Sequence, residues 1–174
     1  LRDVHYRYPS DEGSSGFAIG PVNLTMRKGE IVFIVGENGG GKTTLIKLLL
    51  GLYIPQSGSL LLDGKPVDAT QRDDYRQLFT TVLSDFFLFE DLVQQGEEVP
   101  EEAMVYLERL EIAHKVRIDD GRFSTLDLST GQRKRLALLQ AWTEHRPVLV
   151  FDEWAADQDP TFRRIFYTEL RRFS

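Results

Sequence analysis

The chain has 174 residues, no cysteine and a formal net charge of −6, from 21 Lys and Arg against 27 Asp and Glu. This length corresponds to about one domain, and the absence of cysteine excludes disulfide bonds and thiolate metal sites. With 41% hydrophobic and 28% charged residues the chain is not disordered in bulk, and its net acidity argues against a general nucleic-acid-binding surface.

The first half of the chain alternates predicted strands and helices. The patterns predict an edge strand at Val4–Tyr8 and an extended segment at Phe17–Met26. They then predict a buried parallel strand at Ile31–Val35 and a helix at Lys42–Leu50, which Gly51 ends. Ser59–Leu62 with the Asp63-Gly64 turn is a predicted hairpin edge. A helix is predicted at Gln71–Leu78 and a strand at Phe79–Leu83.

The second half contains more predicted helix. Gln94–Pro100 is a polar surface loop, and helices are predicted over Pro100–Glu111, Leu128–Glu144 and Pro160–Arg172. Val148–Phe151 is a further predicted buried strand. The alternation predicts an α/β fold built around a parallel sheet.

Gly36–Thr43 has the sequence GENGGGKT and fits the phosphate-loop pattern G-x-x-x-x-G-K-[ST], after a predicted strand and at the start of a predicted helix. Glycines let the backbone curl around phosphates, and the N–H groups and helix N-terminus attract the anion. Lys42 would bring charge to the β- and γ-phosphates, and Thr43 would ligate Mg²⁺. The predicted ATP-binding residues here are Gly36, Glu37, Asn38, Gly39, Gly40, Gly41, Lys42, Thr43 and Thr44.

Two acids, Asp152 and Glu153, directly follow the apolar run Val148–Phe151. A parallel strand carries such acids to the carboxyl end of the sheet, beside a phosphate loop. There Asp152 would hold Mg²⁺ through water and Glu153 would act as general base on the attacking water, so Glu153 and Lys42 are the predicted catalytic residues. A solvated strand end is the alternative, which the pairing with an upstream phosphate loop disfavours.

Three further segments carry a resemblance to a known family. Leu128–Gln132, with the sequence LSTGQ, resembles the LSGGQ signature of ABC-type ATPases. Asp152–Asp159, DEWAADQD, is similar to the family's Walker B acids followed by its D-loop, and Asp159 matches the D-loop aspartate. Tyr8, 28 positions before Gly36, resembles the aromatic residue that stacks on adenine.

The resemblance covers essentially the whole chain and implies a fold. We expect a P-loop NTPase of the ABC type, with a mainly parallel core sheet, an antiparallel β subdomain and a helical signature subdomain. The implied division is a single domain over residues 1–174, with a core at 1–83 and 145–174 and a helical subdomain at about 84–144.

In the family, the signature of one copy closes over a nucleotide held by another copy. The resemblance therefore implies a head-to-tail homodimer with ATP between the copies, in which Ser129, Gly131, Gln132 and Asp159 contact the nucleotide. Ser129, Gly131 and the following helix N-terminus would form a second anion cradle. The basic run Arg133–Arg135 either supports the phosphate field or is a solvated helix face.

The detailed sequence of several motifs resembles one subfamily. Ser84 stands where common exporters carry a glutamine that touches Mg²⁺, so Ser84 would reach the metal through water. The Ser84-Asp85 pair, with LSTGQRKRLALL and FDEWAADQDP, resembles exporters of cyclic peptides and siderophores of the pyoverdine and microcin type. In these the ATPase domain follows six membrane helices of the same polypeptide, at the cytoplasmic face of the bacterial inner membrane. No nucleic-acid partner is expected.

The chain lacks an initial Met and finishes in a helix-like segment, so we expect a piece of a longer polypeptide. The family's switch histidine would follow Ser174, and His5, His114 and His145 are predicted surface or partly packed residues. We therefore expect nucleotide binding with slow or no hydrolysis by these residues alone.

Several aromatic residues have open interpretations. Phe86–Phe89 forms either a docking surface for the membrane domain or part of the helical core, with Phe87 buried and Phe86 exposed. Trp142 and Trp154 are predicted packing residues.

Two other functions stay open at this stage. One is a soluble ABC-type ATPase of DNA repair or translation, which the short spacing between Gly36 and Leu128 and the single cassette disfavour. The other is a nucleotide-binding module without turnover.

Overall fold

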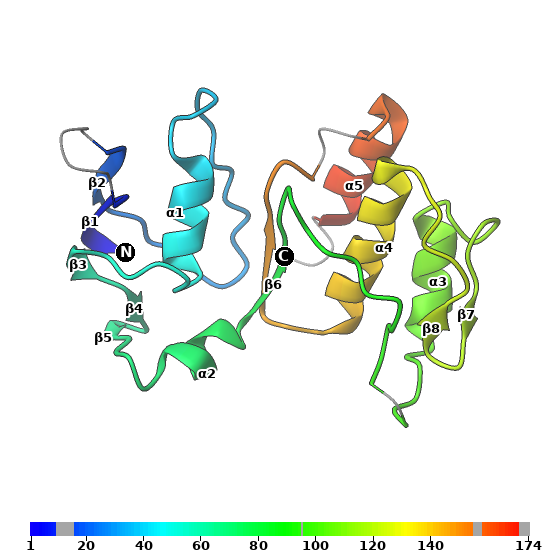
Figure 1. The fold of residues 1–174 in the computed structure, drawn as a ribbon. Coiled ribbons are helices and arrows are strands. Elements are labelled where there is room, and N and C mark those ends of the chain that lie inside the picture. Colours follow the sequence, from blue (N-terminus) through cyan, green and yellow to red (C-terminus); the bar gives the residue numbers. More distant parts are fainter. Residues whose placement is uncertain (10–15, 95, 155–157, 171–174) are drawn as a thin grey trace. The chain divides into compact units, whose positions relative to one another are not determined.

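The computed structural model describes residues 1–9, 16–94, 96–154 and 158–170. They form two compact units (Figure 1). One comprises Leu1–Leu78 with the chain from Ile165, and the other comprises Phe79–Arg164. The predicted division into a core and a helical subdomain stays a prediction.

The first unit is built on a three-stranded antiparallel sheet. Its strands are β1 (Arg2–Arg7), β2 (Ala18–Val22) and β3 (Ser57–Ser59), in the order β2-β1-β3. β1 therefore lies in the middle, and the prediction of an edge strand over Val4–Tyr8 was wrong, because both sides of β1 have a hydrogen-bonded neighbour. The predicted hairpin is confirmed as β4 (Leu61–Leu62) and β5 (Lys65–Pro66).

The helices of this unit follow the sequence signals. α1 spans Lys42–Leu49, buries Ile46, Leu48 and Leu49, and is followed by Gly51 at φ 66°. A left-handed glycine there ends the helix without the strain that a Cβ would cause. α2 spans Arg72–Arg76, so both predicted helices are confirmed with slightly shorter bounds.

The predicted buried strand over Ile31–Val35 was wrong. The segment has no strand conformation, and Phe33 and Val35 are 64% and 87% exposed. A strand needs a neighbour for its N–H and C=O groups, and in the described part of the chain none of the strand pairings includes this segment. Within the first unit, the ring of Phe33 lies 6.1 Å from that of Tyr167, centroid to centroid.

The second unit contains the parallel strands. β6 (Phe79–Val82) and β9 (Val148–Phe151) pair in parallel, with Phe79 opposite Val148 and Val82 opposite Phe151. Both predicted strands are confirmed, although β9 is half-buried rather than fully buried. The two strands are joined through helices, as parallel strands require.

The helices and a small hairpin complete this unit. α3 (Glu102–Arg109) and α4 (Thr130–Thr143) confirm the predicted helices and pack on each other, with the ring centroids of Tyr106 and Trp142 5.0 Å apart. β7 (Ile118–Asp119) and β8 (Arg122–Phe123) form a hairpin that the sequence analysis did not predict. α5 (Pro160–Leu170) begins here, and its residues from Ile165 belong to the first unit.

Trp142 and Trp154 are 4% and 2% exposed, which confirms their packing role. The prediction for the aromatic run was reversed. Phe87 is 74% exposed and Phe86 half-buried, whereas Leu88 enters the core. All three histidines are exposed, as predicted. Among the residues that the structure describes, no helix has the length and apolarity that a membrane span requires.

Candidate nucleotide-binding site

The phosphate-loop segment turns directly into α1. Gly39 and Gly41 have φ 78° and 87°, in the left-handed region where a Cβ is penalised. The Gly40 N–H donates to the Glu37 carbonyl at 3.1 Å and closes the turn. A Cβ on Gly40 would come within 3.0 Å of that carbonyl, and one on Gly41 within 3.0 Å of the Phe17 ring. This turn therefore depends on its glycines.

The N-terminus of α1 is suited to an anion. Gly41 is its N-cap, and no side chain caps the helix there. The first N–H groups of an α-helix have no acceptor within the helix, and the helix dipole places partial positive charge at this end. Gly36–Gly40 are exposed.

Lys42 lies against the loop that precedes it. Its Nζ donates to the carbonyl oxygens of Gly36 and Glu37 at 3.0 and 2.9 Å. The loop's own backbone therefore holds an ammonium group in the first turn of α1, and a phosphate oxygen could replace either carbonyl as acceptor. Thr43 follows in the same turn and is half-buried.

Tyr8 belongs to the same unit and is fixed beside α1. Its hydroxyl and that of the buried Thr44 lie 3.0 Å apart. This hydrogen bond lowers the pKa of the Tyr8 phenol. The Tyr8 ring packs edge-on against Tyr6 and Tyr53, with centroids 5.2 and 5.8 Å apart. Stacking of Tyr8 on adenine stays a prediction.

In the second unit, the predicted metal-binding residues Ser84 and Asp152 lie at one end of the β6–β9 strand pair. Ser84 follows β6 and Asp152 follows β9, and because the strands are parallel both segments leave at the same end. The Asp152 N–H donates to the Val82 carbonyl at 2.9 Å, which extends the pairing by one residue. Asp152 is 4% exposed, and Ser84 is exposed.

The described residues contain no cluster of three His, Cys, Asp or Glu side chains that could enclose a metal ion. Each predicted metal ligand carries an oxygen donor: the Thr43 hydroxyl in the first unit, and the Ser84 hydroxyl and Asp152 carboxylate in the second. Oxygen donors are the ligands that Mg²⁺ prefers, usually one or two carboxylates together with substrate phosphates and water.

Glu153, the predicted general base, is exposed and adopts φ 51°, in the left-handed region. Its backbone carbonyl accepts a hydrogen bond from Lys134 Nζ at 3.1 Å. The indole N–H of the next residue, Trp154, donates to the Lys134 carbonyl at 3.1 Å. α4 is therefore joined to the turn after β9 in both directions.

The signature segment forms the N-terminus of α4. Ser129 is the N-cap, and its hydroxyl accepts from the Gln132 N–H at 3.4 Å, while the Gln132 side chain accepts from the Ser129 N–H at 3.3 Å. This reciprocal pair is a capping box, which satisfies two helix-end donors. The Gly131 carbonyl accepts from the buried side chain of Gln158 at 2.9 Å.

Arg135 connects the signature helix to the D-loop aspartate. Its guanidinium donates to Asp159 at 2.8 Å and to the Gln158 side chain at 3.2 Å, and lies 3.7 Å over the Phe162 ring. The Asp159 carboxylate also accepts the Phe162 N–H at 2.9 Å, the N-cap contact of α5. This backbone hydrogen bond, with the Arg135 charge, lowers the pKa of Asp159.

The predicted signature and D-loop residues share one open cavity of about 530 Å³. Its lining is formed by Ser129, Thr130, Gly131, Gln132, Arg135, Gln158 and Asp159. The rest of the D-loop, residues 155–157, lies outside the described residues.

Three residues of this region were missed or misjudged by the sequence analysis. The solvated-face interpretation of Arg133–Arg135 was wrong for Lys134, which is 3% exposed, and for Arg135, whose side chain is 12% exposed. Each charged group donates to an acceptor in the segment after β9, Lys134 to the Glu153 carbonyl and Arg135 to the Asp159 carboxylate. Gln158 carried no signal beyond its position in the D-loop.

Residues 19–156 match the family of ABC transporters. The chain belongs to the ABC transporter family. The match begins in β2, before the phosphate loop, and extends past the acids that follow β9. The predicted ABC-type ATP-binding domain, with its P-loop α/β fold, is thereby confirmed.

Two relatives share nearly the full chain. "ATP-binding protein SyrD" of Pseudomonas syringae pv. syringae is 53% identical over 98% of the chain, which covers 31% of that protein. "Leukotoxin translocation ATP-binding protein LktB" of Mannheimia haemolytica is 30% identical over 99% of the chain, or 26% of its own length. The chain thus spans between a quarter and a third of these relatives.

Solved structures share the fold. The structure of cbiO1 from Clostridium perfringens, part of the ABC transporter complex cbiONQ, gives a TM-score of 0.71 at 26% identity and covers 99% of this chain and 72% of its own. A bacterial Atm1-family ABC exporter with ATP bound gives 0.75 at 23% identity, over 99% of this chain and 32% of its own.

Proposed function

We propose that the chain binds MgATP through Gly36–Thr43 and hydrolyses it as the motor domain of an ABC exporter. The observation that carries this proposal is the entry of a glycine turn into α1, with Gly39 and Gly41 left-handed and no side chain capping the helix. Such an end offers N–H groups and positive potential to a phosphate. Tyr8 would stack on the adenine.

In the proposed reaction each group has a separate task. Lys42 donates to the β- and γ-phosphate oxygens and stabilises the charge that develops on them. Thr43 and Asp152 would hold Mg²⁺, with Ser84 contributing through water, and the bound metal would supply charge neutralisation on the phosphates. Glu153 takes a proton from the attacking water.

The signature and D-loop residues would serve a second copy of the chain. Ser129, Gly131, Gln132 and Asp159 line one cavity next to a helix N-terminus, which supports their assignment to an anionic ligand. In a head-to-tail dimer this cavity would close over the ATP held by the other copy, so that hydrolysis depends on dimerisation.

We infer that the cargo is a cyclic peptide or siderophore. This cargo class follows from the resemblance of Ser84-Asp85 and the signature segment to cyclic peptide and siderophore exporters. The lower identity to a leukotoxin translocation protein, 30% against 53% to SyrD, makes a toxin polypeptide the less favoured cargo. The membrane domain would belong to the same polypeptide, and the chain would work at the cytoplasmic face of the bacterial inner membrane. The exposed pair Phe87 and Phe89, with ring centroids 4.9 Å apart, is suited to docking on that domain.

A Glu153→Gln variant of the intact polypeptide tests the reaction. Removing the general base should lower phosphate release by about 100- to 10,000-fold while ATP affinity is retained. Gel filtration at saturating ATP should show the variant as a dimer. A variant that stays monomeric would contradict the composite site, and unchanged phosphate release would contradict the role of Glu153.

Transport is tested in inside-out vesicles that carry the intact polypeptide. ATP should drive uptake of a cyclic peptide in the wild type, and Glu153→Gln should abolish it. Uptake of an unfolded toxin polypeptide in place of the cyclic peptide would contradict the cargo class.

A further inference from the structure

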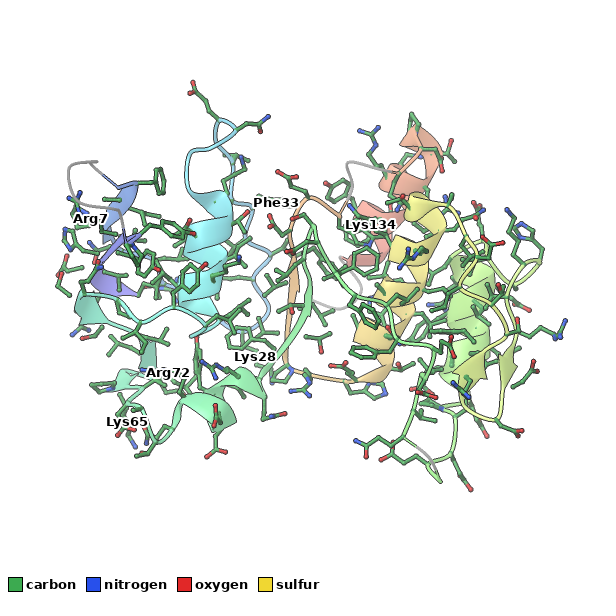
Figure 2. The ribbon with its side chains drawn as sticks, viewed as in Figure 1. Arg7, Lys28, Phe33, Lys65, Arg72 and Lys134 are labelled. Carbon is green, nitrogen blue, oxygen red and sulfur yellow. The ribbon has the colours of Figure 1, made fainter. Side chains whose placement is uncertain are left out.

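We propose that Lys134 is a positioning residue that holds the candidate base Glu153 in its working geometry. This inference rests on the proposed hydrolysis and deepens it. Lys134 lies on α4, where Figure 2 labels it, and its Nζ donates to the Glu153 backbone carbonyl at 3.1 Å.

Lys134 is buried to an extent that is rare for lysine. It is 3% exposed, although it lies between Arg133 and Arg135 in a run that would suit a solvated helix face. A buried ammonium group is costly unless it has hydrogen-bond partners. The carbonyl of Glu153 is one such partner, and Glu153 is the candidate general base of the proposed reaction.

The contact is one half of a reciprocal pair. Lys134 donates from its side chain to Glu153, and Trp154 donates from its indole to the Lys134 carbonyl at 3.1 Å. Trp154 itself is 2% exposed and packs on Phe162, with ring centroids 5.9 Å apart. The turn after β9 is thus attached to α4 by two hydrogen bonds, one from a side chain of α4 and one from a side chain of the turn.

This attachment acts on a residue with unusual backbone geometry. Glu153 has φ 51°, a conformation that penalises a residue with a Cβ and persists only where the surroundings hold it. A donor on its carbonyl favours that peptide orientation. The exposed Glu153 carboxylate is therefore presented from a turn that is itself fixed.

The same contact connects the base to the signature. Lys134 lies five residues after Ser129 on one continuous helix, so a ligand that shifts the N-terminus of α4 also shifts the donor on Glu153. Lys134 would therefore align the base when the signature engages a nucleotide.

The test compares kcat, KM and equilibrium ATP affinity in the intact polypeptide. Lys134→Met keeps the length and apolar stem of the side chain and removes the donor. We expect kcat to fall by about 10- to 100-fold, as for a displaced catalytic group, while KM and ATP affinity stay within about twofold. Lys134→Arg restores a charged donor and should recover most of kcat.

Two further variants serve as a control and as a second test. Lys65→Met removes an exposed lysine on β5, labelled in Figure 2, and should leave all three quantities unchanged. Lys134→Gln keeps a neutral N–H donor and should give an intermediate kcat, and it decides the question if Lys134→Met does not fold.

The outcomes separate this inference from the proposed function. If Lys134→Met hydrolyses ATP as fast as the wild type, the role of Lys134 is overturned and the proposed function is not. A fall in kcat accompanied by equal losses of ATP affinity and thermal stability in the Met and Gln variants would also overturn it, since that pattern indicates a structural role. Absence of turnover in the wild type would overturn the proposed function and this inference with it.

Discussion

The chain contains two helix N-termini that sequence patterns associate with phosphate, and they differ in how their N–H groups are satisfied. α1 begins after Gly41, in the left-handed region, with no side chain capping it. α4 begins at Ser129, where a capping box with Gln132 occupies two donors at 3.4 and 3.3 Å.

The difference implies a division of labour. An uncapped glycine turn leaves its donors to a ligand, whereas a capped end is stable by itself and would have to exchange internal hydrogen bonds for those of a ligand. We therefore expect α1 to determine how tightly one copy binds ATP, and α4 to contribute to folding and to the closed dimer.

The largest effect should follow Lys42→Met. The variant loses a charge-assisted hydrogen bond to the phosphates, worth about 1.5–3 kcal/mol, so ATP affinity should fall by about 10- to 100-fold. Isothermal titration with ATP measures this, with Lys65→Met as the matched lysine control. Equal affinity in wild type and Lys42→Met would contradict the assignment of α1 as the binding end.

Next in size is Gly41→Ala. A Cβ in the left-handed region costs about 1–2 kcal/mol, and this Cβ would also come within 3.0 Å of the Phe17 ring. Thermal unfolding should show the loss. Gly36→Ala is the matched control, because a Cβ on Gly36 meets nothing within 4 Å, and equal unfolding temperatures for the two variants would argue against a strained turn at Gly41.

Ser129→Ala should act on stability rather than on ATP affinity. Loss of the cap costs about 1 kcal/mol, which lowers the unfolding temperature by about 2–4 °C for a domain of this size. ATP affinity of the monomer should be unchanged. A Ser129→Ala variant with wild-type stability and weakened monomer binding would reverse the roles of the two helix ends.

The smallest effect concerns Asp159→Asn and pH. The carboxylate has a lowered pKa, chiefly from the Phe162 N–H, so its stabilising contribution is present above its unfolded pKa and is lost as pH falls through the folded value. Unfolding temperatures from neutral pH to about pH 3 should therefore drop slightly more in the wild type than in Asp159→Asn. Parallel curves would show that the ionised form of Asp159 is not favoured by folding.

Local signals in the sequence were sufficient for the elements that make their own hydrogen bonds. α1, α3 and α4 were predicted because apolar spacing and their end residues act within one helix. The β4–β5 hairpin followed from Asp63-Gly64, whereas β7 and β8, two residues each, were missed because such short strands show no alternation.

Features that depend on distant partners could not be predicted. Apolar character at Ile31–Val35 indicated a strand, but pairing needs a neighbour that composition does not specify. The burial of Lys134 depends on Glu153, a residue 19 positions away, and a basic triplet shows no sign of it. The motif residues themselves were identifiable, whereas the contacts among Arg135, Gln158 and Asp159 required the structure.

Hydrogen–deuterium exchange of the Glu153→Gln polypeptide, with and without MgATP, compares how ATP protects the N-termini of α1 and α4. At a concentration too low for dimerisation, ATP should slow exchange of the amides from Gly39 to Leu45 and leave those from Ser129 to Arg133 unchanged. At high concentration the second set should also become protected. ATP binding without protection of the first set would contradict the assignment of α1 as the helix end that binds ATP in one copy.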